Sequence, residues 1–150
     1  MRYQWSKLNR IQKGTFGEYF AKMEFTMYGF EVYTSEVDDR GIDFVARHEN
    51  GAFLEVQVKT VSDNNLPFVN ASKFKQSDLF VVSLVRLIES FEPQLYLFRG
   101  TDWPSGDGLL IYSSYEGKKS EPAYEIRLAK SRNEILETYS FDNRVNQIGA

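Results

Sequence analysis

The chain has 150 residues, of which 42% are hydrophobic and 15% aromatic, and its formal net charge is −3. This length and composition favour one folded domain, residues 1–150, and argue against disorder. With no cysteine, the chain has no disulfide, thiolate zinc site or cysteine nucleophile. Its single histidine, His48, argues against multi-histidine metal sites and a serine–histidine–aspartate triad.

The lengths of the apolar runs and the net charge restrict where the protein is located and which partners it binds. No apolar run approaches the ~20 residues of a membrane span, and residues 1–15 lack the apolar middle of a signal peptide. We therefore expect a cytoplasmic protein without membrane contact. The slightly acidic balance excludes a generally basic nucleic-acid coat but allows a local basic patch.

The first part of the chain predicts one helix followed by three strands. Apolar residues at three- and four-residue steps predict a helix over residues 8–28, which Gly29 ends. Gly14 and Gly17 each cost this helix about 1 kcal/mol relative to alanine, which indicates a close backbone approach on their face. Strands are expected over residues 30–34, 42–48 and 52–60, and Glu49-Asn50-Gly51 is typical of the hairpin turn between the last two.

The remaining elements complete a mixed fold. We expect a short helix over residues 71–76, a buried strand over 78–87, and strands over 94–98, 109–112 and 123–128. A helix over residues 131–139 is indicated by Ser131 and Glu134, which are spaced as a capping box. This order predicts an α/β (α+β) fold with one mixed central sheet flanked by helices.

Polar residues on two neighbouring strands form the first candidate site. Period-2 alternation places Glu55, Gln57 and Lys59 on one face of the third strand, and Asp43 on the corresponding face of the second. Carboxylate and amide oxygens suit Mg²⁺, and a lysine can orient or deprotonate a water or stabilise developing phosphorane charge. The alternative is a polar hairpin face that is only solvated, as is common in antiparallel sheets.

Three segments together resemble the PD-(D/E)XK nuclease superfamily, in its restriction-endonuclease-like and Holliday-junction-resolvase-like branches. They are Gly14-x-x-Gly17-Glu18-x-x-Ala21, Arg40-Gly41-Ile42-Asp43-Phe44 and Gln57-Val58-Lys59. The order helix-Glu, strand-Asp, strand-Gln-x-Lys and the spacings match over residues 8–62. The chain departs from the pattern at Gln57, where the family name has Asp or Glu, so the third motif is a glutamine variant.

The resemblance implies a fold, a reaction and a site. The fold is a restriction-endonuclease-like αβββαβ core, and the reaction is Mg²⁺-dependent hydrolysis of DNA phosphodiester bonds by an endonuclease, with Mn²⁺ as a substitute ion. Carried over residue by residue, the catalytic set is Glu18, Asp43, Gln57 and Lys59. The metal ligands are Asp43, Gln57, Glu18 and the backbone carbonyl of Val58. Glu55, on the same strand face, offers a carboxylate that partly compensates for Gln57.

Six basic residues are candidates for DNA contacts. They are Lys7, Arg10 and Lys13 at three-residue steps along the first helix, Arg40 before the site loop, and Lys73 and Lys75 after the third strand. The expected partner is duplex or branched DNA, cut by a homodimer or higher homo-oligomer. Two other functions stay open: a nucleic-acid-binding module of this fold without turnover, and a small interaction protein with a solvated hairpin face.

Overall fold

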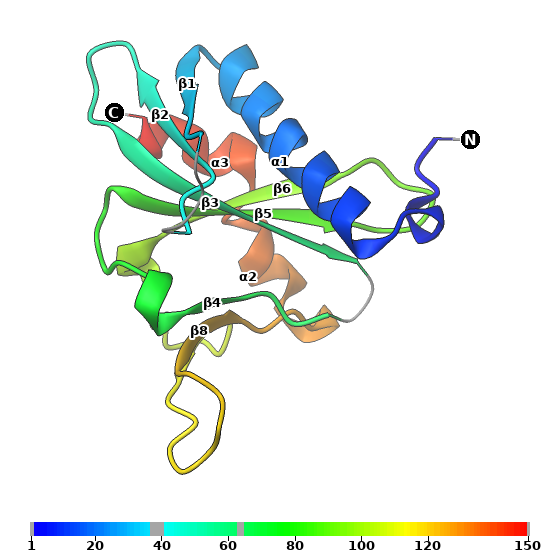
Figure 1. Ribbon diagram of the computed structural model, residues 1–150, viewed down its shortest axis with the longest axis vertical. Coiled ribbons are helices and arrows are strands. Elements are labelled where there is room, and N and C mark those ends of the chain that lie inside the picture. The colour runs from blue at the N-terminus through cyan, green and yellow to red at the C-terminus, as the bar shows by residue number, and fades with distance from the viewer. Residues whose placement is uncertain (1, 37–40, 63–64, 150) are drawn as a thin grey trace.

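The structure, a computed structural model, describes residues 2–36, 41–62 and 65–149. Its centre is a five-stranded sheet in the order β1-β2-β3-β5-β6 (Figure 1). The strands are β1 (Phe30–Thr34), β2 (Phe44–His48), β3 (Leu54–Ser62), β5 (Phe80–Leu87) and β6 (Gln94–Arg99). β1, β2 and β3 form an antiparallel meander, β5 is parallel to β3, and β6 is antiparallel to β5. The predicted class, a mixed central sheet flanked by helices, is confirmed.

The helix α1 (Arg10–Met27) covers one face of this sheet. It begins with a capping box, in which the Asn9 side chain accepts from the backbone N–H of Gln12 and the Gln12 side chain accepts from that of Asn9. It is preceded by a 3-10 turn, η1 (Trp5–Lys7). Lys7 therefore lies outside α1, and the prediction of one helical row of basic residues is wrong for it.

The apolar stripe that predicts α1 is mostly on its exposed side. Ile11, Tyr19, Met23 and Met27 have exposed fractions of 80%, 62%, 60% and 73%. The buried side instead uses Gly17, Ala21 and Phe25, with Phe16 and Phe20 at its edge. Periodicity correctly indicates a helix here, but the small residues select the face that packs on the sheet.

Gly17 is where α1 lies against β3. A β carbon at this position would lie 1.8 Å from Oγ1 of Thr60, so only glycine allows this helix-to-sheet distance. A β carbon at Gly14 would meet nothing within 4 Å among the described residues. The predicted close approach is therefore confirmed at Gly17 and wrong at Gly14.

The connection from β3 to β5 contains a short strand that the sequence does not predict and a 3-10 turn in place of a predicted helix. It consists of β4 (Phe68–Asn70) and a 3-10 turn, η2 (Ala71–Lys73), which replaces the helix predicted over residues 71–76. β4 is the edge of a second, three-stranded sheet in the order β4-β8-β7, with β7 (Leu110–Ser113) and β8 (Ala123–Ile126). The loop that joins β7 to β8 projects at the bottom of Figure 1.

The C-terminal helices also differ from the prediction. The expected helix over residues 131–139 is divided into a 3-10 turn, η4 (Lys130–Arg132), and the short α2 (Asn133–Glu137), which has no side-chain cap. A further helix, α3 (Phe141–Ile148), was not predicted. Among the described residues, no helix has the length and apolar character to cross a membrane.

The central sheet separates two hydrophobic cores. One contains Phe25 of α1 and Val145 of α3 packed on Val56 and Val81. The other contains Val82 and Phe98 of the central sheet, together with residues of the small sheet, α2 and the loop residue Trp103. Alternate residues of β5 point into opposite cores, which explains why that strand is apolar almost throughout.

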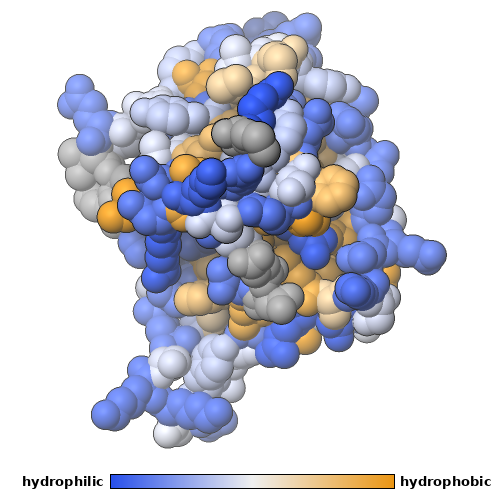
Figure 2. Space-filling view, turned by 90° about the vertical axis from the view of Figure 1, so that its right-hand side faces the viewer, coloured by the Kyte–Doolittle hydropathy of each residue, from blue (hydrophilic) through white to orange (hydrophobic). Residues whose placement is uncertain are grey.

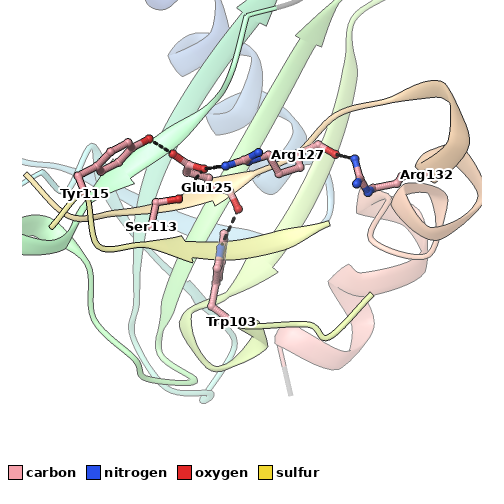
Figure 3. A network of polar contacts seen from close by, with 6 residues as sticks. All are labelled: Trp103, Ser113, Tyr115, Glu125, Arg127 and Arg132. Carbon is pink, nitrogen blue, oxygen red and sulfur yellow. Dashed lines mark hydrogen bonds and ion pairs between the residues drawn. The ribbon is translucent and has the colours of Figure 1, made fainter. Parts of the chain in front are cut away.

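A buried carboxylate holds the small sheet together. Glu125 of β8 accepts hydrogen bonds from Ser113 and Tyr115 and pairs with Arg127, whose Nη2 lies 2.7 Å from Oε1 (Figure 3). The indole N–H of Trp103 donates to the Glu125 backbone carbonyl at 3.0 Å. Burial raises the pKa of Glu125, but these hydrogen bonds and the Arg127 charge outweigh it and keep the pKa below its ordinary value.

Candidate active site

A cleft of about 840 Å³ opens between α1 and the segment that leads into β4. The first half of α1 forms one wall, residues 65–68 form the other, and residues 58–62 of β3 form the floor. Asp43, just before β2, completes the lining. Figure 2 shows the face at the N-terminal end of α1, where apolar and hydrophilic atoms lie side by side.

Asp43 is fixed by the backbone of β3. The N–H of Val58 donates to Oδ2 of Asp43 at 2.6 Å, and the N–H of Asp43 donates to the Val56 carbonyl at 2.9 Å. Phe44 pairs with Val56 in the β2–β3 ladder, so one further step of the register places Asp43 opposite Gln57. Residues opposite each other in a ladder share a face of the sheet.

Glu18 and Lys59 line the same cleft as Asp43. Glu18 comes from α1, directly after the contact between Gly17 and Thr60, and its carboxylate pairs with Lys22 at 3.0 Å. Lys59 comes from β3 and is partly buried. The structure thus brings together three residues that are far apart in the sequence, and it also places Val58 in the lining.

Gln57 is placed differently from the other three. It is buried, with 8% of its surface exposed, and it is absent from the cleft lining. Its Oε1 has no hydrogen-bond partner among the described residues. A β carbon on Gly41, whose φ is +75°, would lie 3.2 Å from that oxygen and 2.9 Å from Cδ of Lys73. Gln57 is therefore packed under the loop that leads to Asp43.

Glu55 is occupied by an ion pair. Its carboxylate lies 2.6 Å from Nζ of Lys75, and neither residue lines the cleft. The predicted compensation of Gln57 by Glu55 therefore has no geometric support. Lys75, a candidate for DNA contact, pairs with Glu55, and its side chain remains 55% exposed.

Two of the basic candidates lie in the cleft wall. Arg10 and Lys13 both line it, and Nζ of Lys13 donates to Oγ of Ser62 at 2.9 Å. Lys7 is exposed but is absent from the lining, and Lys73 lies beside Gly41. Arg40 lies outside the described residues.

The donor set of the cleft fits a hard cation. Among the described residues, no group of three histidine, cysteine, aspartate or glutamate side chains could hold a metal ion. The cleft lining includes two residues with carboxylate side chains, Asp43 and Glu18, and the β3 residue Val58. Mg²⁺ binds through one or two carboxylates and keeps several waters. Gln57, whose Oε1 has no hydrogen-bond partner among the described residues, does not belong to this lining.

The wall opposite α1 contains residues that the motifs do not indicate. Leu66 and Phe68 line it and remain 41% and 45% exposed. The sequence feature that could indicate this wall is the pair of large apolar residues on either side of Pro67, directly after the polar run of Asp63, Asn64 and Asn65.

The fold is shared with two solved nuclease structures. One is Hjc, a Holliday junction resolvase of the archaeal hyperthermophile Archaeoglobus fulgidus. It has a TM-score of 0.50 and 16% identity, over 82% of this chain and 88% of that one. The other is the bacterial homing endonuclease I-Ssp6803I, with a TM-score of 0.56 and 17% identity, over 94% of this chain and 91% of that one. Both are PD-(D/E)XK-like nucleases.

Sequence comparisons add no closer assignment. No protein-family model matches the chain, and neither does any curated protein. The similarity to the two solved structures concerns the fold alone: a five-stranded mixed sheet flanked by helices, similar to that of restriction-endonuclease-like nucleases.

Proposed function

We propose that this protein is a metal-dependent DNA endonuclease of the PD-(D/E)XK type, which hydrolyses phosphodiester bonds. One observation supports this most strongly. Glu18, Asp43 and Lys59 line a single cleft. They come from α1, from the residue just before β2 and from β3, in a fold that is shared with a resolvase and a homing endonuclease.

Each cleft residue has a definite task in this proposal. Asp43, Glu18 and the Val58 carbonyl would hold Mg²⁺, which would supply positive charge to neutralise phosphate oxygens and to acidify a bound water. The Val58 N–H fixes the Asp43 carboxylate in advance, so little ordering is needed when substrate binds. Lys59 orients the attacking water or takes its proton. Arg10 and Lys13 contact phosphates beside the scissile bond.

Gln57 favours a second candidate function, a DNA-binding module of this fold without turnover. An amide oxygen lacks the charge of the carboxylate that the family motif provides, and the one acid on β3, Glu55, is paired with Lys75. Such a module binds DNA through Arg10 and Lys13 but leaves it intact. Cleavage separates the two functions.

The test uses supercoiled plasmid, linear duplex, single strands and a four-way junction, each with Mg²⁺, Mn²⁺ or chelator. We expect cleavage with either ion, none with chelator, and products with 5′-phosphate and 3′-hydroxyl ends. Asp43→Asn should abolish cleavage while its side-chain oxygen still accepts from Val58. Lys59→Ala should also abolish it, and Lys130→Ala, at an exposed lysine of η4, should not. Full cleavage by both site variants would contradict the assignment.

The oligomeric state forms part of the same proposal. One cleft faces one strand, so cutting both strands of a duplex calls for a symmetric dimer. Light scattering coupled to size-exclusion chromatography, with and without DNA, measures this directly. A protein that stays monomeric on DNA and still makes double-strand breaks would contradict the dimer.

A further inference from the structure

Three exposed apolar side chains meet at the cleft. Ile11 of α1 is 80% exposed, and Leu66 and Phe68 on the facing wall are 41% and 45% exposed. Large apolar groups in contact with water are unfavourable by about 25 cal/mol per Å². Their position on both walls of one cleft indicates a ligand with an apolar surface of its own.

The backbone that carries Phe68 is firmly held. Phe68 pairs with Glu125 in the β4–β8 ladder, and the N–H of Ile126 donates to the Pro67 carbonyl at 3.0 Å. The next residue, Val69, points to the other side of β4 and is 2% exposed in the second core. Alternation along a well-paired strand thus directs Phe68 away from that core, so its exposure follows from the fold.

The facing wall has the charge that a nucleic-acid strand requires. Arg10 and Lys13 are on α1 beside Ile11, and Lys13 is kept in place by Ser62. The cleft volume of about 840 Å³ is within the range of about 300–1,000 Å³ typical of small-molecule pockets. A cleft of this size accommodates a few nucleotides of one strand but not a whole duplex.

We propose that Phe68, with Leu66 beside it, stacks on an unpaired base of the DNA strand, while Arg10 and Lys13 bind the neighbouring phosphates. This inference rests on the proposed nuclease function and specifies its substrate class, DNA with unpaired nucleotides next to the scissile bond. Base–aromatic stacking suits such strands because every base has a π face, whereas paired bases are already stacked in the duplex.

The test compares DNA binding by Phe68→Ala with binding by the native protein. The probes are a 12-nucleotide single strand with one 2-aminopurine, a four-way junction and a fully paired duplex, all with Ca²⁺ in place of Mg²⁺. We expect Phe68→Ala to weaken binding to the single strand and the junction about tenfold or more, and binding to the duplex less than twofold. Quenching of 2-aminopurine by the native protein should disappear in the variant.

Matched variants separate stacking from other effects. Phe91→Ala removes another exposed phenylalanine, 64% exposed and outside the cleft lining, and should bind like the native protein. Phe68→Tyr keeps the ring and should keep affinity, whereas Phe68→Leu keeps the apolar character and should lose it. Circular dichroism of each variant controls for folding.

Two kinds of failure are distinguishable. If the native protein cuts DNA and Phe68→Ala binds every probe as Phe91→Ala does, the stacking inference is wrong and the nuclease proposal stands. An equal loss on duplex and unpaired probes also overturns the inference. If the native protein binds none of the DNA probes, the proposed function fails and the inference fails with it. Tighter binding to the matching RNA strand would overturn the assignment to DNA.

Discussion

Gly17 allows a quantitative test of how α1 is positioned on the sheet. Alanine gains about 1 kcal/mol over glycine inside a helix. At Gly14 a β carbon meets nothing within 4 Å among the described residues, so Gly14→Ala should raise the free energy of unfolding by about 0.5–1 kcal/mol. At Gly17 the β carbon would lie 1.8 Å from Oγ1 and 2.9 Å from Cβ of Thr60. Overpacking of this kind costs about 1–3 kcal/mol. After the helix-propensity gain of about 1 kcal/mol the net loss is about 0–2 kcal/mol, which makes Gly17→Ala about 1–3 kcal/mol less stable than Gly14→Ala.

Urea unfolding of the two variants, followed by tryptophan fluorescence, measures this difference. Trp5 lies in one core and Trp103 in the other, so unfolding of both cores in the same transition would also support two-state behaviour. The melting temperature should fall by about 2–4 °C for each kcal/mol lost. Thr60→Ala removes Oγ1 and should restore part of the loss in a double-mutant cycle. A Gly17→Ala protein as stable as Gly14→Ala would refute the close-contact argument.

Three further predictions concern charge. Glu125→Gln should lower the free energy of unfolding by about 2 kcal/mol, because the ion pair with Arg127 is lost. The pKa of Glu125 in the folded protein is below its ordinary value of 4.5, so the native protein has this stabilisation in full above pH 4.5 and loses it as the pH falls further. Denaturant unfolding midpoints measured at several pH values should show this loss in the native protein and not in the variant. Burial and the nearby Asp142 raise the pKa of Glu24, so this group opposes folding once it is ionised. Glu24→Gln should raise the free energy of unfolding by a few tenths of a kcal/mol at pH 7 and leave it unchanged at pH 3, as measured by the same unfolding midpoints. Gln57→Glu should tighten Mg²⁺ or Mn²⁺ binding in calorimetric titration, since hard cations prefer carboxylates, and unchanged affinity would mean that Gln57 is not a ligand.

Local sequence signals predict the sheet well because they act over short distances. The strand over residues 30–34 has the predicted bounds. The helix α1 is predicted as an element but not in its orientation. Its apolar stripe around Tyr19 suggests a buried side, whereas packing requires the small residues Gly17 and Ala21 at the sheet.

Long-range pairing accounts for most of what the sequence does not reveal. β4 exists because β8 pairs with it, and no local pattern in Phe68–Asn70 indicates a partner at Ala123–Ile126. In the candidate site, too, local motifs indicate some residues, whereas long-range pairing places others. Motif order indicates Glu18, Asp43 and Lys59, but not the wall at Phe68, whose position depends on that distant strand.

The pairing of β4 with β8 also imposes an order on folding during synthesis. Synthesis runs from the N-terminus, so α1, β2 and β3 emerge before β8 is available. Until then β4 is an unpaired strand with Phe68 in contact with water. Unpaired strands with apolar side chains are templates for aggregation. A chain shortened before Ala123 therefore retains Glu18, Asp43 and Lys59 but leaves β4 without its neighbour, which makes the small sheet a determinant of solubility as well as of cleft shape.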